Sequence, residues 1–181
     1  MTFNVDPTAL TQAASIEFVS YSGDKAVPGL VEPETPEPEP EVDPEKEEAL
    51  EIGDRMTDHF KSGMNHLTPV QEYMSKVPAY SENPYGDAQY VKFSIDGITG
   101  FQSDVEKVIE NCGDNSYWSG VKTLAENLLE DVEEAVALFD RVGNSSSPTS
   151  TDISQARNSY LYILKAWSGV MDASSSVVKG L

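Results

Sequence analysis

The sequence has one cysteine, two histidines and few basic residues, and each scarcity narrows what the protein can be. The single Cys112 cannot form an internal disulfide, so the fold does not depend on cross-links. Only 12 Lys and Arg stand against 31 Asp and Glu, and the resulting net charge of −19 repels nucleic acid and anionic membrane surfaces. We therefore predict no nucleic-acid partner, whereas a basic protein partner stays open.

Long apolar runs are also missing from the sequence. No run approaches the roughly 18 residues that a membrane-spanning helix needs. The first residues lack the basic-then-apolar order of a cleaved signal peptide. We expect no membrane span, and a protein that is either cytoplasmic or exported without a cleaved signal peptide.

Residue types that carry catalysis are scarce or poorly spaced. His59 and His66 are seven residues apart on one predicted helix, about 10 Å along its axis, and neither has a carboxylate three or four residues away on that helix. Cys112 has no adjacent basic residue to activate its thiol. The main carboxylate cluster lies on the solvated face of a predicted helix, whereas acid–base catalysis needs an apolar pocket; it comprises Glu130, Asp131, Glu133 and Glu134.

No Gly-rich phosphate loop and no Cys-x-x-Cys pair occurs in the sequence either. We therefore predict a protein that is not an enzyme, with no catalytic residue, no metal site, no cofactor and no small-molecule substrate. A small enzyme that uses Asp or Glu with His59 or His66 is the least favoured alternative.

The composition divides the chain into three parts. Residues 1–30 mix turn signals with two short apolar patches, which predicts at most a short helix at about 7–19. Residues 31–43 are a Pro/Glu repeat with almost no apolar side chain to bury, so we expect a disordered acidic linker. Residues 44–181 show helical periodicity, which predicts an all-α domain of four to five helices.

The first helix of this domain is predicted to begin at Asp43-Pro44, an N-cap residue followed by proline at the first helical position. Its predicted apolar face comprises Ala49, Ile52, Met56, Phe60, Met64 and Leu67. Thr68-Pro69 then predicts a corner, followed by a shorter helix that ends near Val77-Pro78. Turn signals at Asn83-Pro84 and Asp96-Gly97 then predict a packed loop over 79–100.

A helix at about 101–111 is predicted to stop at Gly113, and an antiparallel helical hairpin, 119–142 and 152–181, forms the centre of the predicted fold. Thr149 and Asp152 have the spacing of a capping box at the start of the last helix. The first arm has an apolar stripe of Val121, Leu124, Leu128, Val132, Ala135, Phe139 and Val142. The second has Ile153, Ala156, Tyr160, Ile163, Trp167, Val170, Ser174, Val177 and Leu181.

The last helix carries more aromatic and methionine surface than one neighbouring helix readily covers. Two interpretations stay open: an ordinary core helix, or a helix that packs against a protein partner or other copies of the chain. For the second, the predicted interaction residues are Tyr160, Tyr162, Ile163, Trp167, Val170, Met171, Val177 and Leu181, together with Trp118.

Two family resemblances concern this region. Trp118-Ser119-Gly120 at a helix corner resembles the Trp-x-Gly motif of WXG100-type exported hairpins. Pro148, Ser154-Gln155, Asn158-Ser159-Tyr160 and the terminal helix resemble the C-terminal halves of type III secretion needle and inner-rod subunits. That resemblance implies a secreted helical subunit of an assembly.

The sequence thus predicts a non-enzymatic interaction or assembly protein, such as an exported structural subunit of a secretion apparatus or particle, that acts through its amphipathic C-terminal helix. The alternative is an acidic inhibitor or nucleic-acid mimic that binds a basic partner protein, which the charge of −19 suggests.

Overall fold

The computed structural model describes residues 43–181, which form five α-helices and a short 3₁₀ helix. They are α1 (Pro44–Met74), α2 (Pro84–Phe93), α3 (Ile95–Cys112), η2 (Ser116–Trp118), α4 (Ser119–Gly143) and α5 (Ser150–Gly180). This described part of the chain contains no strand, so the predicted all-α fold is confirmed. The predictions of a helix at 7–19 and of a disordered linker up to residue 42 lie outside the described residues.

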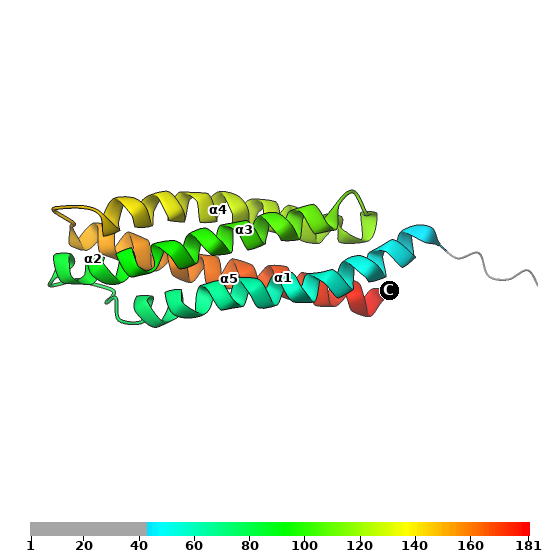
Figure 1. Cartoon of the computed structure of the whole chain (residues 1–181), viewed down its shortest axis with the longest axis horizontal. Coiled ribbons are helices and arrows are strands. Elements are labelled where there is room, and N and C mark those ends of the chain that lie inside the picture. The colour runs from blue at the N-terminus through cyan, green and yellow to red at the C-terminus, as the bar shows by residue number, and fades with distance from the viewer. Residues whose placement is uncertain (1–42) are drawn as a thin grey trace, which may run out of the picture. The chain divides into compact units, whose positions relative to one another are not determined.

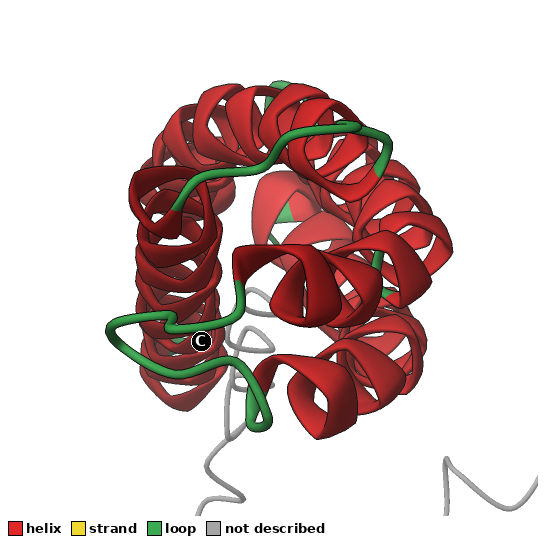
Figure 2. Ribbon diagram, turned by 90° about the vertical axis from the view of Figure 1, so that its left-hand side faces the viewer, coloured by secondary structure: helices red, strands yellow, loops and turns green. Residues whose placement is uncertain are grey.

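The four long helices α1, α3, α4 and α5 lie alongside one another (Figure 1) and surround a common core (Figure 2). α1 packs mainly on α3, α3 on α4, and α4 on α5, whereas α1 and α5 touch each other much less. The short α2 packs chiefly against α4 at one end of the bundle. The bundle therefore has three well-packed helix pairs and one looser pair, α1 and α5.

The predicted packed loop at 79–100 is wrong, because most of this segment is helical. Asn83 caps α2 by accepting a hydrogen bond from Gly86 N at 3.2 Å, and Pro84 follows at the first helical position. Asp43 caps α1 in the same way, through Glu45 N at 3.0 Å. Asn83-Pro84 therefore begins a helix in the same way as Asp43-Pro44. The prediction was wrong because Asn-Pro is also typical of a turn.

Gly97 lies inside α3 and not in a turn, and its role is to let two helices approach closely. A Cβ atom at this position would lie 2.5 Å from Val70 Cγ2 and 2.9 Å from the backbone oxygen of His66. Both of these neighbours belong to α1. The glycine that suggested a turn is thus the contact point of α1 with α3.

The predicted corner at Thr68 is also wrong, because α1 continues through Pro69 to Met74. Thr68 is not a cap: its Oγ1 donates back to the carbonyl of Met64 at 2.7 Å. Pro69 removes one helical hydrogen bond. Burial of Val70 and Met74 on the face that continues from Leu67 offsets this loss, and the helix stays intact.

The hairpin of α4 and α5 is confirmed. Thr149 Oγ1 accepts from Asp152 N at 3.2 Å while Asp152 Oδ2 accepts from Thr149 N at 2.9 Å, so the predicted capping box is present. The stripe of α4 differs at one place, since Leu124 is 44% exposed and Ala125 takes the buried position. The stripe of α5 is buried from Ile153 to Ser174.

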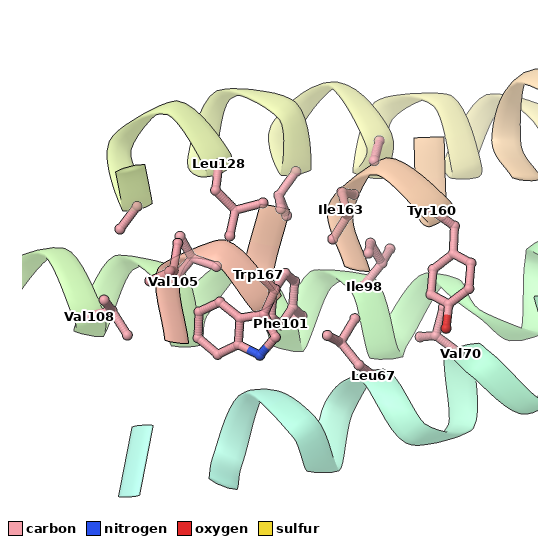
Figure 3. Close-up of a cluster of buried hydrophobic side chains, with 14 of the residues drawn as sticks. Leu67, Val70, Ile98, Phe101, Val105, Val108, Leu128, Tyr160, Ile163 and Trp167 are labelled. Carbon is pink, nitrogen blue, oxygen red and sulfur yellow. The ribbon is translucent and has the colours of Figure 1, made fainter. Parts of the chain in front are cut away.

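Trp167 of α5 is the centre of the core (Figure 3). Its ring makes edge-on contacts with Phe101 of α3 at 5.0 Å and with Phe60 of α1 at 5.1 Å between centroids. The ring fits against Gly63 of α1, where a Cβ atom would lie 2.7 Å from Trp167 Cζ2. Phe60 and Met64 were predicted on the buried face of α1. They lie on either side of Gly63 in the sequence and are partly exposed.

The turn after α3 holds the beginning of α1. Gly113 ends α3 as predicted and has a positive φ of 55°, which favours glycine. Asn115 Nδ2 then donates to the backbone oxygen of Glu45 at 2.9 Å and to Glu48 Oε2 at 3.1 Å. Hydrogen bonding from Ser116 lowers the pKa of the Glu45 carboxyl. These contacts fix the end of α1 that adjoins the Pro/Glu segment.

Candidate functional site: the groove between α1 and α5

The structure places the nine predicted interaction residues in different environments. Those buried in the core are Trp118, Tyr160, Ile163, Trp167 and Val170. Those partly buried are Met171, Val177 and Leu181, whereas Tyr162 is 56% exposed. The regular stripe of α5 therefore faces the bundle, and a partner of the closed bundle must use residues beside that stripe.

An apolar surface beside the stripe follows the contact between α1 and α5. We call it the α1–α5 groove, and define it by the residues that line three hollows along these two helices. The first hollow, of about 300 Å³, is lined by Gly53, Met56, Thr57, Phe60, Trp118, Met171, Ser174, Ser175, Val178 and Lys179. The second, of about 390 Å³, is lined by Thr57, Phe60, Lys61, Met64, Asn65 and Met171. The third, of about 180 Å³, is lined by Gln71, Met74, Ser75, Arg157, Tyr160, Leu161 and Leu164.

The groove follows α1 from Gly53 to Ser75, which corresponds to about 33 Å at 1.5 Å per residue. Several of its apolar side chains are well exposed, including Met64 at 39% and Val178 at 48%. Large apolar side chains exposed in a row commonly mark a surface that another molecule covers. Of the predicted interaction residues, those that line the groove are Trp118, Tyr160 and Met171.

Small residues explain why the hollows exist. Gly53 allows Val178 and Trp118 to approach α1, since a Cβ atom there would lie 3.1 Å from Val178 Cγ2. The Trp118 ring is fixed by a hydrogen bond from its Nε1 to the carbonyl of Ala49 at 2.9 Å. The helices thus meet at Gly53 and Gly63, and shallow space remains on either side of these contacts.

The described part of the chain is acidic, whereas the charged residues that line the hollows are basic. Residues 43–181 contain 23 acidic and 11 basic residues, a net charge of −12. On α1, four exposed carboxylates follow one another at spacings of four, three and four residues, which places them in one stripe: Glu47, Glu51, Asp54 and Asp58. Lys61, Lys179 and Arg157 line the hollows themselves, and Lys61 Nζ lies 3.5 Å from Asp58 Oδ1 of the stripe.

Two polar atoms of α5 are buried without a hydrogen-bond partner among the described residues, Tyr160 Oη and Trp167 Nε1. Both lie on the side of α5 that faces α1 (Figure 3). Burial raises the pKa of Tyr160 to about 12, so its hydroxyl stays protonated near neutral pH and is available as a donor. Unpaired buried donors are uncommon in native proteins and call for an explanation.

A side-chain pair that the sequence did not reveal joins α1 to α3. His66 Nδ1 lies 2.6 Å from Asp104 Oδ2, and Lys107 Nζ lies 3.5 Å from Asp104 Oδ1. Asp104 is fully buried, while the His66 ring lies over Gly100. Spacing along one helix could not show a pair whose members are 38 residues apart. Over residues 43–181 no group of three or more His, Cys, Asp or Glu could hold a metal ion.

Cys112 is buried at the end of α3, and burial raises the pKa of its thiol to about 11. We expect the native protein to react with a thiol reagent at pH 8 only as fast as it opens, and the unfolded protein to react at once. Because the folded-state pKa is the higher one, Cys112 favours folding below the unfolded pKa and loses this contribution as the pH rises toward 11. Timed labelling with and without urea measures the difference, and equal rates would contradict a buried thiol.

Comparisons with known proteins provide no family for this chain. No protein-family model, no curated protein and no solved structure matches it. The resemblances to secretion needle subunits and to WXG100 hairpins therefore stay predictions. Within the described helices, none is both long enough and apolar enough to cross a membrane, in agreement with the prediction.

Proposed function

We propose that this protein is a non-enzymatic interaction protein that binds an amphipathic helix of a partner protein in the α1–α5 groove. One observation carries the proposal: mainly apolar hollows lie in line along α1 and α5, which are the most loosely packed neighbours among the four long helices. A fifth long helix in this position would contact both α1 and α5 and cover Phe60, Met64 and Met171. Methionine-lined grooves suit this mode of binding, because the flexible side chains adapt to the apolar residues of the incoming helix.

The charge of the surface indicates the chemistry of the partner. The carboxylate stripe of α1, from Glu47 to Asp58, runs beside the groove and favours a partner helix with basic residues along one flank. A second copy of this acidic chain would meet repulsion at the same place. For this reason we propose that the partner is a different protein with basic flanking residues, and not a second copy of this chain. An exported assembly subunit, which would pack against its own copies, is less well supported by these charges.

A pair of model peptides of about 22 residues tests the proposal. Both carry leucine at helical spacing, and one has lysine and the other glutamate at the flanking positions. We expect the Leu/Lys peptide to bind with micromolar affinity, measured by fluorescence anisotropy, and the Leu/Glu peptide to bind at least about tenfold more weakly. Met64→Glu combined with Val178→Glu should weaken binding of the Leu/Lys peptide by at least about tenfold, because it places charge in two hollows.

The matched control is Leu124→Glu combined with Tyr162→Glu. These two residues are also exposed and apolar, at 44% and 56%, but they line none of the three hollows. The control variant should bind the Leu/Lys peptide as the natural chain does. If both double variants weaken binding equally, the attraction is general to an acidic surface and the groove is not its site.

The second candidate function is an acidic inhibitor or nucleic-acid mimic. It is favoured by the carboxylates fixed on the outer side of α4, where burial and the neighbouring Glu134 and Glu130 raise the pKa of Asp131. A mimic would bind a basic protein through α4. Its binding would therefore survive Met64→Glu combined with Val178→Glu, which distinguishes it from the first proposal.

A further inference from the structure

The third hollow of the groove differs chemically from the other two. It lies between the last turns of α1 and the first half of α5, and polar groups sit on both of its sides. Gln71 and Ser75 come from α1, while Arg157 and Tyr160 come from α5. Apolar contact is provided by Met74, Leu161 and Leu164. A hollow with this lining suits a ligand that has both a polar and an apolar end.

Two groups that line this hollow suit the same kind of ligand. The Tyr160 side chain is only 3% exposed, and its hydroxyl has no acceptor within the described residues. Tyr160 lines the hollow, and its ring extends from α5 toward Val70 of α1 (Figure 3). Arg157 has no carboxylate within 4 Å among residues 43–181. A neutral donor and a cation beside one hollow are complementary to a carboxylate.

We infer that this end of the groove binds a carboxylate joined to an apolar group. The acid oxygens accept hydrogen bonds from the Tyr160 hydroxyl and the Arg157 guanidinium, and the apolar group packs on Leu161 and Leu164. The hydroxyl is buried in the free protein, so an acid reaches it only when a side chain that lines the hollow, such as the unbranched Met74, changes rotamer. The inference goes beyond the proposed function, because it concerns a free acid in one hollow of the groove and does not require that a helix binds there.

Phenylpropionate is a suitable probe, and phenylpropionamide is its neutral counterpart of the same shape. The volume of about 180 Å³ corresponds to about six water molecules, which is enough for a small aromatic acid. Titration of the full chain, followed by two-dimensional NMR, should show saturable shifts at Arg157 and Tyr160. The amide should bind at least about tenfold more weakly than the acid, because it cannot pair with the guanidinium.

Tyr160→Phe separates a binding role from a structural one. Removing an unpaired buried hydroxyl should leave the melting temperature of the free protein unchanged or higher, while binding of phenylpropionate weakens about three- to tenfold. Arg157→Gln should weaken it by about tenfold or more, and Lys165→Gln, an exposed control on α5, by less than about twofold. Met64→Glu combined with Val178→Glu should leave acid binding intact, since neither residue lines this hollow.

Three results would overturn the inference. The first is equal binding of the acid and the amide. The second is unchanged acid binding by Tyr160→Phe. The third is a lower melting temperature of free Tyr160→Phe, which would mean that the hydroxyl already has a partner such as a water molecule. If the Leu/Lys peptide does not bind, these three measurements can still be made and interpreted. The proposal of a helix-binding groove and the inference of an acid-binding hollow can therefore be refuted independently.

Discussion

Trp167→Ala is expected to lower the free energy of unfolding by about 3 to 5 kcal/mol, the range for removal of a large aromatic side chain from a core. Trp167 is 1% exposed and touches Phe60 of α1 and Phe101 of α3, so its removal opens a cavity that three helices border. Urea unfolding followed by circular dichroism measures the loss. The effect should appear whether or not a partner is present, because the ring faces the protein's own core.

Tyr162→Ala is the matched control for this experiment. Tyr162 lies on the same helix, is aromatic and was predicted from the sequence to belong to the same interaction surface, yet it is 56% exposed. Its replacement should change the free energy of unfolding by no more than about 0.5 kcal/mol. Similar losses for the two variants would show that Trp167 is not the centre of the core.

Gly97→Ala is expected to lower the free energy of unfolding by about 1 to 3 kcal/mol, the usual cost of overpacking. The added methyl group would meet Val70 Cγ2 at 2.5 Å and the backbone oxygen of His66 at 2.9 Å, and neither atom belongs to a flexible side-chain end. α1 and α3 must therefore move apart. The same urea experiment measures the loss.

Gly169→Ala provides the comparison, because this glycine is also inside a helix but has nothing within 4 Å of the position of a Cβ atom. Alanine should raise the free energy of unfolding here by about 0.5 to 1 kcal/mol through its better helix propensity. The two substitutions thus have opposite expected signs. An increase for Gly97→Ala as well would contradict the close contact of α1 and α3.

The helices with strong local signals could be predicted from the sequence. Asp43-Pro44, Gly113 and the Thr149–Asp152 capping box mark helix ends through contacts within a few residues, and the structure confirms each of them. The stripe of α5 was likewise visible, because helical periodicity is a local property. What the stripe could not reveal is which neighbour covers it, and the structure shows that the bundle itself does so.

The errors share one physical cause, which is that glycine and proline serve tertiary packing as well as turns. The sequence suggested a turn at Gly97, but this glycine provides space for α1. It suggested a corner at Pro69, but α1 continues there because its buried face extends past the proline. Asn83-Pro84 fits both a turn and a helix start, and only the buried residues that follow decide between them. These distinctions depend on partners far away in the sequence.

The candidate site was only partly predictable. Three of the nine predicted residues line the groove, namely Trp118, Tyr160 and Met171. Ile163, Trp167 and Val170 are buried in the core instead. The contribution of α1 was missed, because Phe60 and Met64 fit the pattern of buried residues on their helix. The buried position on this turn of α1 is Gly63, against which Trp167 packs, and Met64 next to it is 39% exposed.

The most direct measurement of the central claim is the NMR spectrum of isotope-labelled methionine methyl groups during titration with the Leu/Lys peptide. The methionines that line the groove are Met56, Met64, Met74 and Met171, and Met64 and Met171 line the same hollow. We predict saturable shifts of the Met64 and Met171 signals, and loss of these shifts with the Leu/Glu peptide. Peptide binding that leaves both signals unmoved would contradict the claim that the α1–α5 groove is the binding site.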